Sequence, residues 1–324
     1  MFKALLLEES GKDTHASLKR LNESQLTTGD VLVKVDYSTL NYKDALAITG
    51  KGKIVRQWPM VPGIDYAGTV LASDHPDHRI GDEVILTGWG VGEQHWGGLA
   101  EKACAKGDWL IPMPTGMSAR RAMAIGTAGF TAMLGLMALE HAGIKPEQGP
   151  ILVTGATGGV GSVAVRLLVK AGFEVHAATG RPQHADWLRE LGASDIVDRA
   201  DLDKEPAALE SQHWAGAIDS VGGRTLAKIL SQTKMDGAVA ACGLAGGVAL
   251  NTTVMPFILR GVQLIGINSV YMPREKRIEA WQRLQTSLPL NFEDEAREFT
   301  LEQSIEAAHD LLAGKLRGRV VIQP

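Results

Sequence analysis

The chain has 324 residues, enough for two domains, and its apolar content of 45% is ordinary for a protein with large buried cores. Its formal net charge of −4 does not indicate binding to nucleic acid or to an anionic membrane. The two cysteines, Cys104 and Cys242, cannot form a disulfide framework or a four-cysteine zinc site. We identify no signal-peptide layout and no membrane-spanning run, so a cytoplasmic protein is expected.

The first part of the chain, residues 1–121, has the pattern of a β-rich domain. Valines at 31, 33 and 35 and Tyr37 alternate with mostly polar residues, which indicates a half-buried strand. Other strands are predicted at 1–9, 66–71 and 79–86, and a loop or short helix at 40–46. Segment 88–98 contains five glycines and two tryptophans. We interpret it as a mobile flap over a ligand or, alternatively, as a packed surface loop.

The middle of the chain, residues 122–270, alternates between strand and helix patterns. Small and apolar residues predict a buried helix around 121–141. Short apolar runs that predict strands occur at 151–153, 174–179, 195–197, 215–219, 238–241 and 264–267. This alternation predicts an α/β fold with a doubly wound parallel sheet. The chain then becomes polar and helical, and Gly318–Ile322 predicts a last strand that returns to the first domain. We expect domains at 1–121 with 271–324 and at 122–270.

A glycine-rich loop, Thr154–Ser162, joins the strand predicted at 151–153 to a helical pattern that ends at Gly172. Glycines at such a turn let the backbone approach a pyrophosphate, whose charge meets the helix N-terminus. The motif is incomplete, because Ala156 stands where a strict G-x-G-x-x-G has its first glycine. A glycine turn without a ligand is the alternative, but four glycines weaken a fold unless close approach is needed. The predicted dinucleotide contacts are Thr157, Gly158, Gly159 and Val160.

The end of the next predicted strand distinguishes between the two nicotinamide cofactors. An NAD site usually has a carboxylate about 20 residues after the glycines, to bind the ribose 2′-hydroxyl. Here the chain reads Thr179-Gly180-Arg181, without an acid. A 2′-phosphate would be met by a hydroxyl, a glycine N–H and a guanidinium, so we predict NADPH. The alternative for Arg181 is a solvated residue that opens the helix at Pro182.

Ligands of open parallel sheets lie beyond the carboxyl ends of the strands. Three more segments are therefore cofactor candidates, namely 219–222, 242–247 and 268–270. Within them we single out Ser220, Leu244 and Ser269. Ordinary loop chemistry at strand ends is the alternative for each.

Several segments in a fixed order resemble a known family. Asn41–Asp44, Pro62–Gly68 and the Gly-Gly-Val-Gly loop together resemble the medium-chain dehydrogenase/reductase superfamily, in its quinone-oxidoreductase-like branch. The longer strings 40–53 and 86–93 are similar to those of the NADPH-dependent acryloyl-CoA reductases. This resemblance implies a GroES-like catalytic domain, a Rossmann NADPH-binding domain and a homodimer.

The zinc alcohol dehydrogenases of that superfamily differ from this chain at their metal ligands. They place a histidine before the acid of a Gly-His-Glu segment, whereas Ile64 precedes Asp65 here. A cysteine ligand near Asn41–Asp44 and the structural-zinc cysteine cluster are also missing. We therefore expect no metal site. His95 and Asp65 could belong to an unrelated metal site, but their context gives no support for one.

The resemblance implies an oxidoreductase that reduces the C=C bond of acryloyl-CoA to propanoyl-CoA without zinc. By the same resemblance Tyr42 lies in the active-site cleft, where it would contact the cofactor and serve as the catalytic polar group. The alternative is a tyrosine that only braces its loop. Asn41 and Asp44 are expected to fix that loop by hydrogen bonds. Arg319 is a weaker candidate, with a salt-bridged strand residue as its alternative.

The substrate's coenzyme A phosphates could be met by the basic residues Lys51, Lys53 and Arg56, which could equally be a solvated loop. The sequence leaves acryloyl-CoA, crotonyl-CoA, a quinone and a free enone open as substrates. An NADPH:quinone oxidoreductase is the enzymatic alternative. A non-catalytic NADPH-binding sensor is the alternative from another class.

Overall fold

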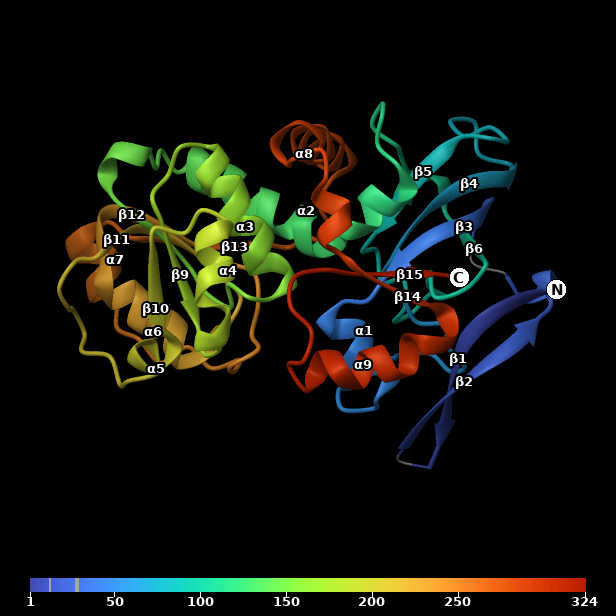
Figure 1. Ribbon diagram of the computed structural model, residues 1–324, viewed down its shortest axis with the longest axis horizontal. Helices are drawn as coiled ribbons and strands as arrows, with labels where there is room; N and C mark the ends of the chain where they lie inside the picture. Colours follow the sequence, from blue (N-terminus) through green and yellow to red (C-terminus); the bar gives the residue numbers. More distant parts are fainter. Residues whose placement is uncertain (12, 27–28) are drawn as a thin grey trace. The chain divides into compact units, whose positions relative to one another are not determined.

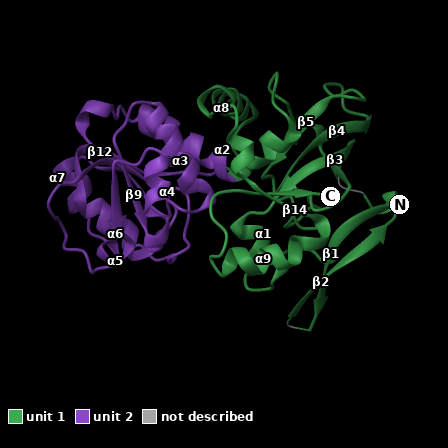
Figure 2. Ribbon diagram, viewed as in Figure 1, with its two compact units in different colours: residues 1–127, 269–324 green, residues 128–268 purple. Residues whose placement is uncertain are grey.

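The computed structural model describes residues 1–11, 13–26 and 29–324. The chain forms two compact units, coloured separately in Figure 2. Unit 1 comprises Met1–Thr127 and Ser269–Pro324, and unit 2 comprises Ala128–Asn268. The sequence prediction divides the chain after residues 121 and 270.

Unit 1 is β-rich (Figure 1). Its strands are β1 (Phe2–Ser10), β2 (Asp13–Leu21), β3 (Val31–Thr39), β4 (Asp65–Ser73), β5 (Glu83–Thr87), β6 (Lys102–Ala105), β7 (Ile111–Pro112), β14 (Arg297–Thr300) and β15 (Val320–Gln323). Its α-helices are α1 (Tyr42–Ile48), α8 (Arg274–Ser287) and α9 (Ser304–Leu312). Its short 3₁₀ helices are η1 (Glu23–Gln25), η2 (Gly107–Trp109), η5 (Phe292–Glu295) and η6 (Leu301–Gln303).

The main sheet of unit 1 has the strand order β14-β15-β3-β4-β5-β7, with β6 paired to β3. Val31, Val33 and Val35 of β3 are buried against Tyr66 and Val84, as the alternating pattern predicts. β15 pairs antiparallel with β3, Val321 opposite Thr39. The prediction that the last strand returns to the first domain is therefore confirmed.

Helix α1 follows β3 and begins with a capping box. The Asp44 carboxylate accepts the Asn41 backbone N–H at 2.8 Å, across the first turn of the helix. One face of α1, with Ala45 and Ile48, is buried against Ala308 of α9. The capping box and the packing against α9 thereby hold α1 in place within unit 1.

Unit 2 is an α/β domain. Its strands are β8 (Ile151–Val153), β9 (Val175–Thr179), β10 (Asp195–Asp198), β11 (Trp214–Asp219), β12 (Thr233–Ala241) and β13 (Gln263–Gly266). Its helices are α3 (Gly159–Lys170), α4 (Ala185–Glu190), α5 (Arg199–Leu202), α6 (Gly223–Gln232) and α7 (Met255–Arg260), with the 3₁₀ helices η3 (Pro146–Gln148) and η4 (Pro182–His184). All sheet pairs are parallel, in the order β10-β9-β8-β11-β12-β13. This confirms the predicted doubly wound sheet. Helices α5 and α6 pack side by side (Figure 1).

Helix α2 (Ala119–His141) begins in unit 1 and continues into unit 2. It matches the buried helix predicted around 121–141, although its length and the mean hydropathy of 1.7 of its apolar window would also permit a membrane span. However, 83% of its apolar window is buried inside the protein, which is typical of a core helix. The helix is interrupted at Gly126, where φ is +52°.

The segment 88–98 is packed against other residues of unit 1. Gly90, Val91 and Gly97 are buried, and the backbone N–H groups of Gly97 and Gly92 donate to Val61 and His95 at 2.6 and 2.7 Å. Strands β2, β6, β7 and β14 were not expected from the sequence. β2 is largely polar on both faces and β7 has two residues, so neither carries a hydrophobic period.

Candidate cofactor and active site

The glycine loop of unit 2 is a sharp turn from β8 into α3, as predicted. Gly155 has φ +57°, and a Cβ there would lie 2.6 Å from Ser220 Oγ. A Cβ on Gly161 would lie 2.4 Å from the Gly155 carbonyl oxygen. The first glycine therefore permits the turn, and the last lets the helix pack directly on it.

The middle of the loop leaves room for a ligand. Gly158 is the N-cap of α3 with φ −85°, and a Cβ there would meet one described atom, the Gly155 oxygen at 3.2 Å. The first N–H groups of a helix, here those of Gly159, Val160 and Gly161, have no acceptor inside the helix. They form the positive end of the helix dipole. These residues fit the pyrophosphate of a dinucleotide, and the buried Thr157 lies in the same turn.

The end of β9 carries the residues predicted to bind a 2′-phosphate. Thr179 Oγ1 accepts the Arg181 backbone N–H at 3.0 Å, so the turn around Gly180 is held in place. A Cβ on Gly180 would lie 2.9 Å from Arg199 Nε and Cζ. The structure thus brings a second guanidinium to this turn, which suits a doubly charged phosphate.

Arg199 was missed in the sequence analysis. It follows β10 directly, and β10 pairs with β9 with Asp198 opposite Thr179. Two neighbouring parallel strands end at the same edge of the sheet. A basic residue directly after the strand predicted at 195–197 was the signal that could have found it.

Two other predicted cofactor residues lie on the neighbouring loops of unit 2. Ser220 Oγ donates to the Thr154 carbonyl oxygen at 3.1 Å, which joins the loop after β11 to the glycine loop. Leu244 lies on the loop after β12 and is 63% exposed. A backbone bridge between Gly222 and Gly247 connects these two loops.

The remaining predicted contacts, Tyr42 and Ser269, belong to unit 1. Tyr42 is the first residue of α1 and is 52% exposed. The Ser269 carbonyl oxygen accepts a hydrogen bond from Arg277 Nη2 at 2.9 Å, and Arg277 is buried. Both positions thus lie in segments that hydrogen bonds within unit 1 hold in place.

A buried polar network holds the residue before Tyr42. Asn41 Nδ2 donates to Asp65 Oδ2 at 2.8 Å, and Arg319 Nη1 donates to Asn41 Oδ1 at 3.3 Å. Asp44 accepts the backbone N–H of Ile64 at 2.9 Å. Arg319 also donates to the Ala124 carbonyl oxygen at 2.8 Å. Asn41 and Asp44 brace the loop as expected, and Arg319 lies in this network immediately before β15.

Burial dominates the electrostatics of this network. It raises the pKa of Asp44 to about 7, with a further contribution from the Asp65 charge. It also raises the pKa of Asp65, against hydrogen bonds from Thr127 and Asn41. Burial lowers the pKa of Arg319 to about 10. The two acids are therefore held in a site that penalises their charged forms.

The residues around Asp65 do not fit a zinc ion. Its two carboxylate oxygens already accept hydrogen bonds from Thr127 and Asn41. Its chain neighbour Ile64 has no donor atom to offer a metal. Within the described ranges no group of three or more His, Cys, Asp or Glu side chains could hold a metal ion.

The basic residues considered for coenzyme A follow α1 in unit 1. Lys51, Lys53 and Arg56 are exposed. The neighbouring Lys43 is instead paired with Glu93 at 2.5 Å. The structure therefore leaves the charges of the first three side chains accessible to solvent.

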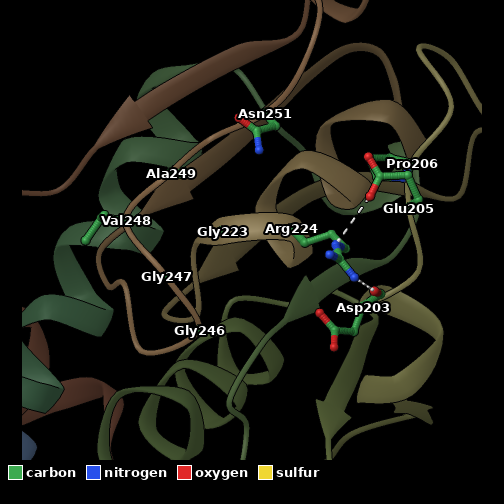
Figure 3. Close-up of a pocket in the computed structure, with 10 residues that line it drawn as sticks. All are labelled: Asp203, Glu205, Pro206, Gly223, Arg224, Gly246, Gly247, Val248, Ala249 and Asn251. Atoms are coloured by element: carbon green, nitrogen blue, oxygen red, sulfur yellow. Dashed lines mark hydrogen bonds and ion pairs between the residues drawn. The ribbon is translucent and has the colours of Figure 1, made fainter.

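A further pocket of about 430 Å³ lies in unit 2 beside the start of α6 (Figure 3). Its rim includes Arg224, which donates to the Asp203 carbonyl oxygen at 3.1 Å and lies 3.5 Å from a carboxylate oxygen of Glu205. Gly246 and Gly247, from the candidate segment 242–247, line this pocket, but the singled-out residues Ser220 and Leu244 do not.

Comparisons with known proteins agree with this architecture. Residues 27–115 match the family described as alcohol dehydrogenase GroES-like domain, and residues 159–286 match that described as zinc-binding dehydrogenase. The probable acrylyl-CoA reductase AcuI of Escherichia coli is 56% identical, over 99% of both chains. The acrylyl-CoA reductase AcuI of Ruegeria pomeroyi is 52% identical, also over 99% of both.

The putative quinone oxidoreductase YhfP of Bacillus subtilis is 46% identical over 100% of this chain and 99% of its own. Among solved structures, the yhdH oxidoreductase of Salmonella enterica in complex with NADP has a TM-score of 0.97. It is 56% identical, with 99% of each chain covered. The B. subtilis yhfP structure with NAD bound has a TM-score of 0.96 at 45% identity, over 100% of this chain and 99% of that one. This chain therefore belongs to the medium-chain dehydrogenase/reductase superfamily, in the group that includes the AcuI acrylyl-CoA reductases and YhfP.

Proposed function

We propose that this protein is an NADPH-dependent reductase that converts acryloyl-CoA to propanoyl-CoA. The observation that carries the proposal is full-length identity of 52–56% to two proteins named as acrylyl-CoA reductases. The choice of NADPH as cofactor is supported by the glycine turn and by the N-terminal N–H groups of α3, which have no acceptor inside the helix. It is also supported by the absence of an acid at Thr179–Arg181.

In this proposal the cofactor phosphates are bound at two places in unit 2. Thr157, Gly158, Gly159 and Val160 receive the pyrophosphate through backbone N–H groups and the helix dipole. Thr179, Gly180 and Arg181 receive the 2′-phosphate, with the Arg199 guanidinium beside Gly180 as a second charge. Ser220, Leu244, Ser269 and Tyr42 complete the proposed set of contacts.

When bound, NADPH supplies a hydride to the β-carbon of the unsaturated thioester. The negative charge that develops on the thioester oxygen needs a hydrogen-bond donor, and a proton from a side chain or water must then reach the α-carbon to give propanoyl-CoA. We assign this donation to the Tyr42 hydroxyl, whose side chain is half-exposed at the N-terminus of α1. The buried network of Asn41, Asp65 and Arg319 holds the backbone from which Tyr42 projects. Such support limits the motion of the donor before reaction.

The coenzyme A part of the substrate carries phosphates, and exposed cations are its natural partners. We propose Lys51, Lys53 and Arg56 for this role, because they lie on the exposed segment after α1. Replacement of both lysines by glutamate should raise KM for acryloyl-CoA and leave kcat nearly unchanged. An unchanged KM would reject this assignment.

The test of the function is NADPH consumption by the purified protein with acryloyl-CoA, with crotonyl-CoA and with a simple benzoquinone. NADH serves as the control for each substrate. Fast, NADPH-selective turnover of acryloyl-CoA supports the proposal. Turnover of the quinone alone would replace it with a quinone oxidoreductase, which the 46% identity to YhfP keeps as the second candidate. Tight NADPH binding without turnover of any of them would indicate a sensor.

We also propose a homodimer in the cytoplasm. β13 is the last strand of the described sheet in unit 2, and such an edge can pair with another chain. Next to it, Ile258 and Leu259 of α7 are 71% and 54% exposed, and Leu264 of β13 is 36% exposed. An apolar edge of this kind fits a second copy of the chain. A monomeric mass by light scattering would reject the dimer.

A further inference from the structure

Three of the segments proposed to hold the cofactor in unit 2 meet at one buried residue, Asp219. This residue ends β11 and is 0% exposed. Its Oδ1 accepts the Thr154 hydroxyl at 2.6 Å, and Thr154 is the first residue of the glycine loop. The same carboxylate accepts the backbone N–H groups of Val221 at 3.3 Å and Gly222 at 2.8 Å.

Asp219 is also tied to the third segment, through its backbone. Its carbonyl oxygen accepts the Cys242 N–H at 2.8 Å and the Cys242 thiol at 3.2 Å. Thr154 Oγ1 in turn accepts the Ser220 N–H at 3.0 Å. One residue therefore links the glycine loop, the turn after β11 and the loop after β12.

These hydrogen bonds require both side-chain oxygens of Asp219 to act as acceptors. Thr154 and Val221 donate to one oxygen of Asp219, and Gly222 donates to the other. An asparagine of the same shape would direct its NH₂ group at one of these donors. Burial raises the pKa of Asp219, and only its three hydrogen bonds oppose that effect. A carboxylate whose charged form is disfavoured by burial adds little to the stability of the fold. Its presence is better explained by the specific arrangement of loops that its hydrogen bonds impose.

We propose that Asp219 is a positioning residue of the NADPH site. Asp219 holds the three loops in the arrangement that receives the cofactor, and its own side chain does not contact the cofactor. The proposal rests on the proposed cofactor but not on the proposed substrate. Its consequence is that the loss of the carboxylate weakens dinucleotide binding beyond any general loss of stability.

The decisive experiment compares Asp219→Asn with Glu210→Gln. Glu210 is a matched control in the same unit, since it also accepts three hydrogen bonds, from Lys228 Nζ, Gln232 Nε2 and the Ala207 N–H. None of these partners belongs to a cofactor segment. We measure the NADPH Kd by fluorescence titration and the Tm of each variant without ligand. Both variants should lose some Tm, but only Asp219→Asn should raise the Kd, by about tenfold or more.

Two further readouts separate positioning from a structural role. The Kd should rise by the same factor for NADPH and NADH, because the bonds of Asp219 support the pyrophosphate loops and not the turn at Thr179. At saturating NADPH, kcat should stay within about threefold of the wild-type value, because Asp219 does not touch the reacting atoms.

Thr154→Val removes one donor to Asp219 and is a milder change, usable if Asp219→Asn does not fold. Thr154→Val should also raise the NADPH Kd. The double variant of Thr154→Val and Asp219→Asn should raise the Kd by less than the product of the two single-variant factors. Equal Kd values for wild-type, Asp219→Asn and Thr154→Val would overturn the inference. A wild-type protein that binds no NADPH would instead overturn the proposed function, so the two failures are distinguishable.

Discussion

Replacement of Gly158 by valine should separate folding from cofactor binding. Gly158 has φ −85° and ψ 178°, an extended conformation that any residue adopts. A Cβ there meets one described atom within 4 Å, the Gly155 oxygen at 3.2 Å. The free protein therefore needs only a small local shift to accept the new side chain.

The expected magnitudes differ widely between stability and binding. The stability change should stay near about 1 kcal/mol, because that is the typical cost of replacing a favoured N-cap residue by an unfavoured one such as valine. The valine methyl groups, however, would occupy the space in front of the N–H groups at the start of α3. Two lost hydrogen bonds to a charged phosphate, at about 1.5–3 kcal/mol each, amount to a weakening of NADPH binding by about 100-fold or more.

Gly161→Ala is the matched control in the same loop. Its Cβ would lie 2.4 Å from the Gly155 oxygen and 2.6 Å from the Ala156 Cα, both backbone atoms. Overpacking of this kind should destabilise the fold by about 1–3 kcal/mol. Calorimetric titration with NADPH and thermal unfolding of both variants complete the assay. A wild-type Kd for Gly158→Val would refute the pyrophosphate placement, and a lower Tm for Gly158→Val than for Gly161→Ala would refute the packing argument.

Five other substitutions or treatments test the rest of the reasoning. Arg181→Asp and Arg199→Ala should each weaken NADPH binding by about tenfold or more while largely sparing NADH, because we propose that both cations bind the 2′-phosphate; equal losses for the two cofactors in titrations would contradict this. Tyr42→Phe should lower kcat about 100-fold if the hydroxyl donates to the thioester oxygen, and an unchanged kcat would limit Tyr42 to a cofactor contact. The raised pKa of Asp44, about 7 in the folded protein against 3.8, means that the folded state binds the extra proton, so stability falls as pH rises between these values. Asp44→Asn should remove the contribution of Asp44 to the pH dependence of the unfolding free energy, at most about 1.4 kcal/mol per pH unit, as measured by urea unfolding. A pH dependence equal to that of the wild-type protein would contradict the raised pKa of Asp44. Prolonged treatment with a chelator should leave reductase activity unchanged, whereas inactivation that zinc reverses would refute the zinc-free reading.

The sequence by itself determined the class of the fold and the kind of cofactor site. Short apolar runs separated by helical periods predict parallel strands, because each strand must be buried on both faces. The glycine turn was recognisable for a similarly local reason. Strand, glycines and helix are consecutive in residues 151–170, so no distant residue is needed to identify them. The missing acid at Thr179–Arg181 is equally a property of adjacent residues.

The absence of the zinc-binding histidine could also be read from the sequence, because Ile64 stands directly before Asp65 in a recognisable segment. Strands such as β2 and β7 could not be predicted. They are held by pairing with β1 and β5, and their own side chains carry little hydrophobic period. The packed state of the loop 88–98 was likewise undecided, because glycine and tryptophan suit a flap and a packed loop equally.

Only the tertiary structure decided which distant residues support the site. Arg199 lies beside Gly180 because β9 and β10 are neighbours in the sheet, a pairing that no local pattern specifies. Asp219 reaches Thr154 because β11 pairs with β8, 65 residues earlier in the chain. Buried carboxylates take their function from the donors that the fold collects around them. The identity of those donors depends on strand order and register, which are properties of the whole unit and not of any segment.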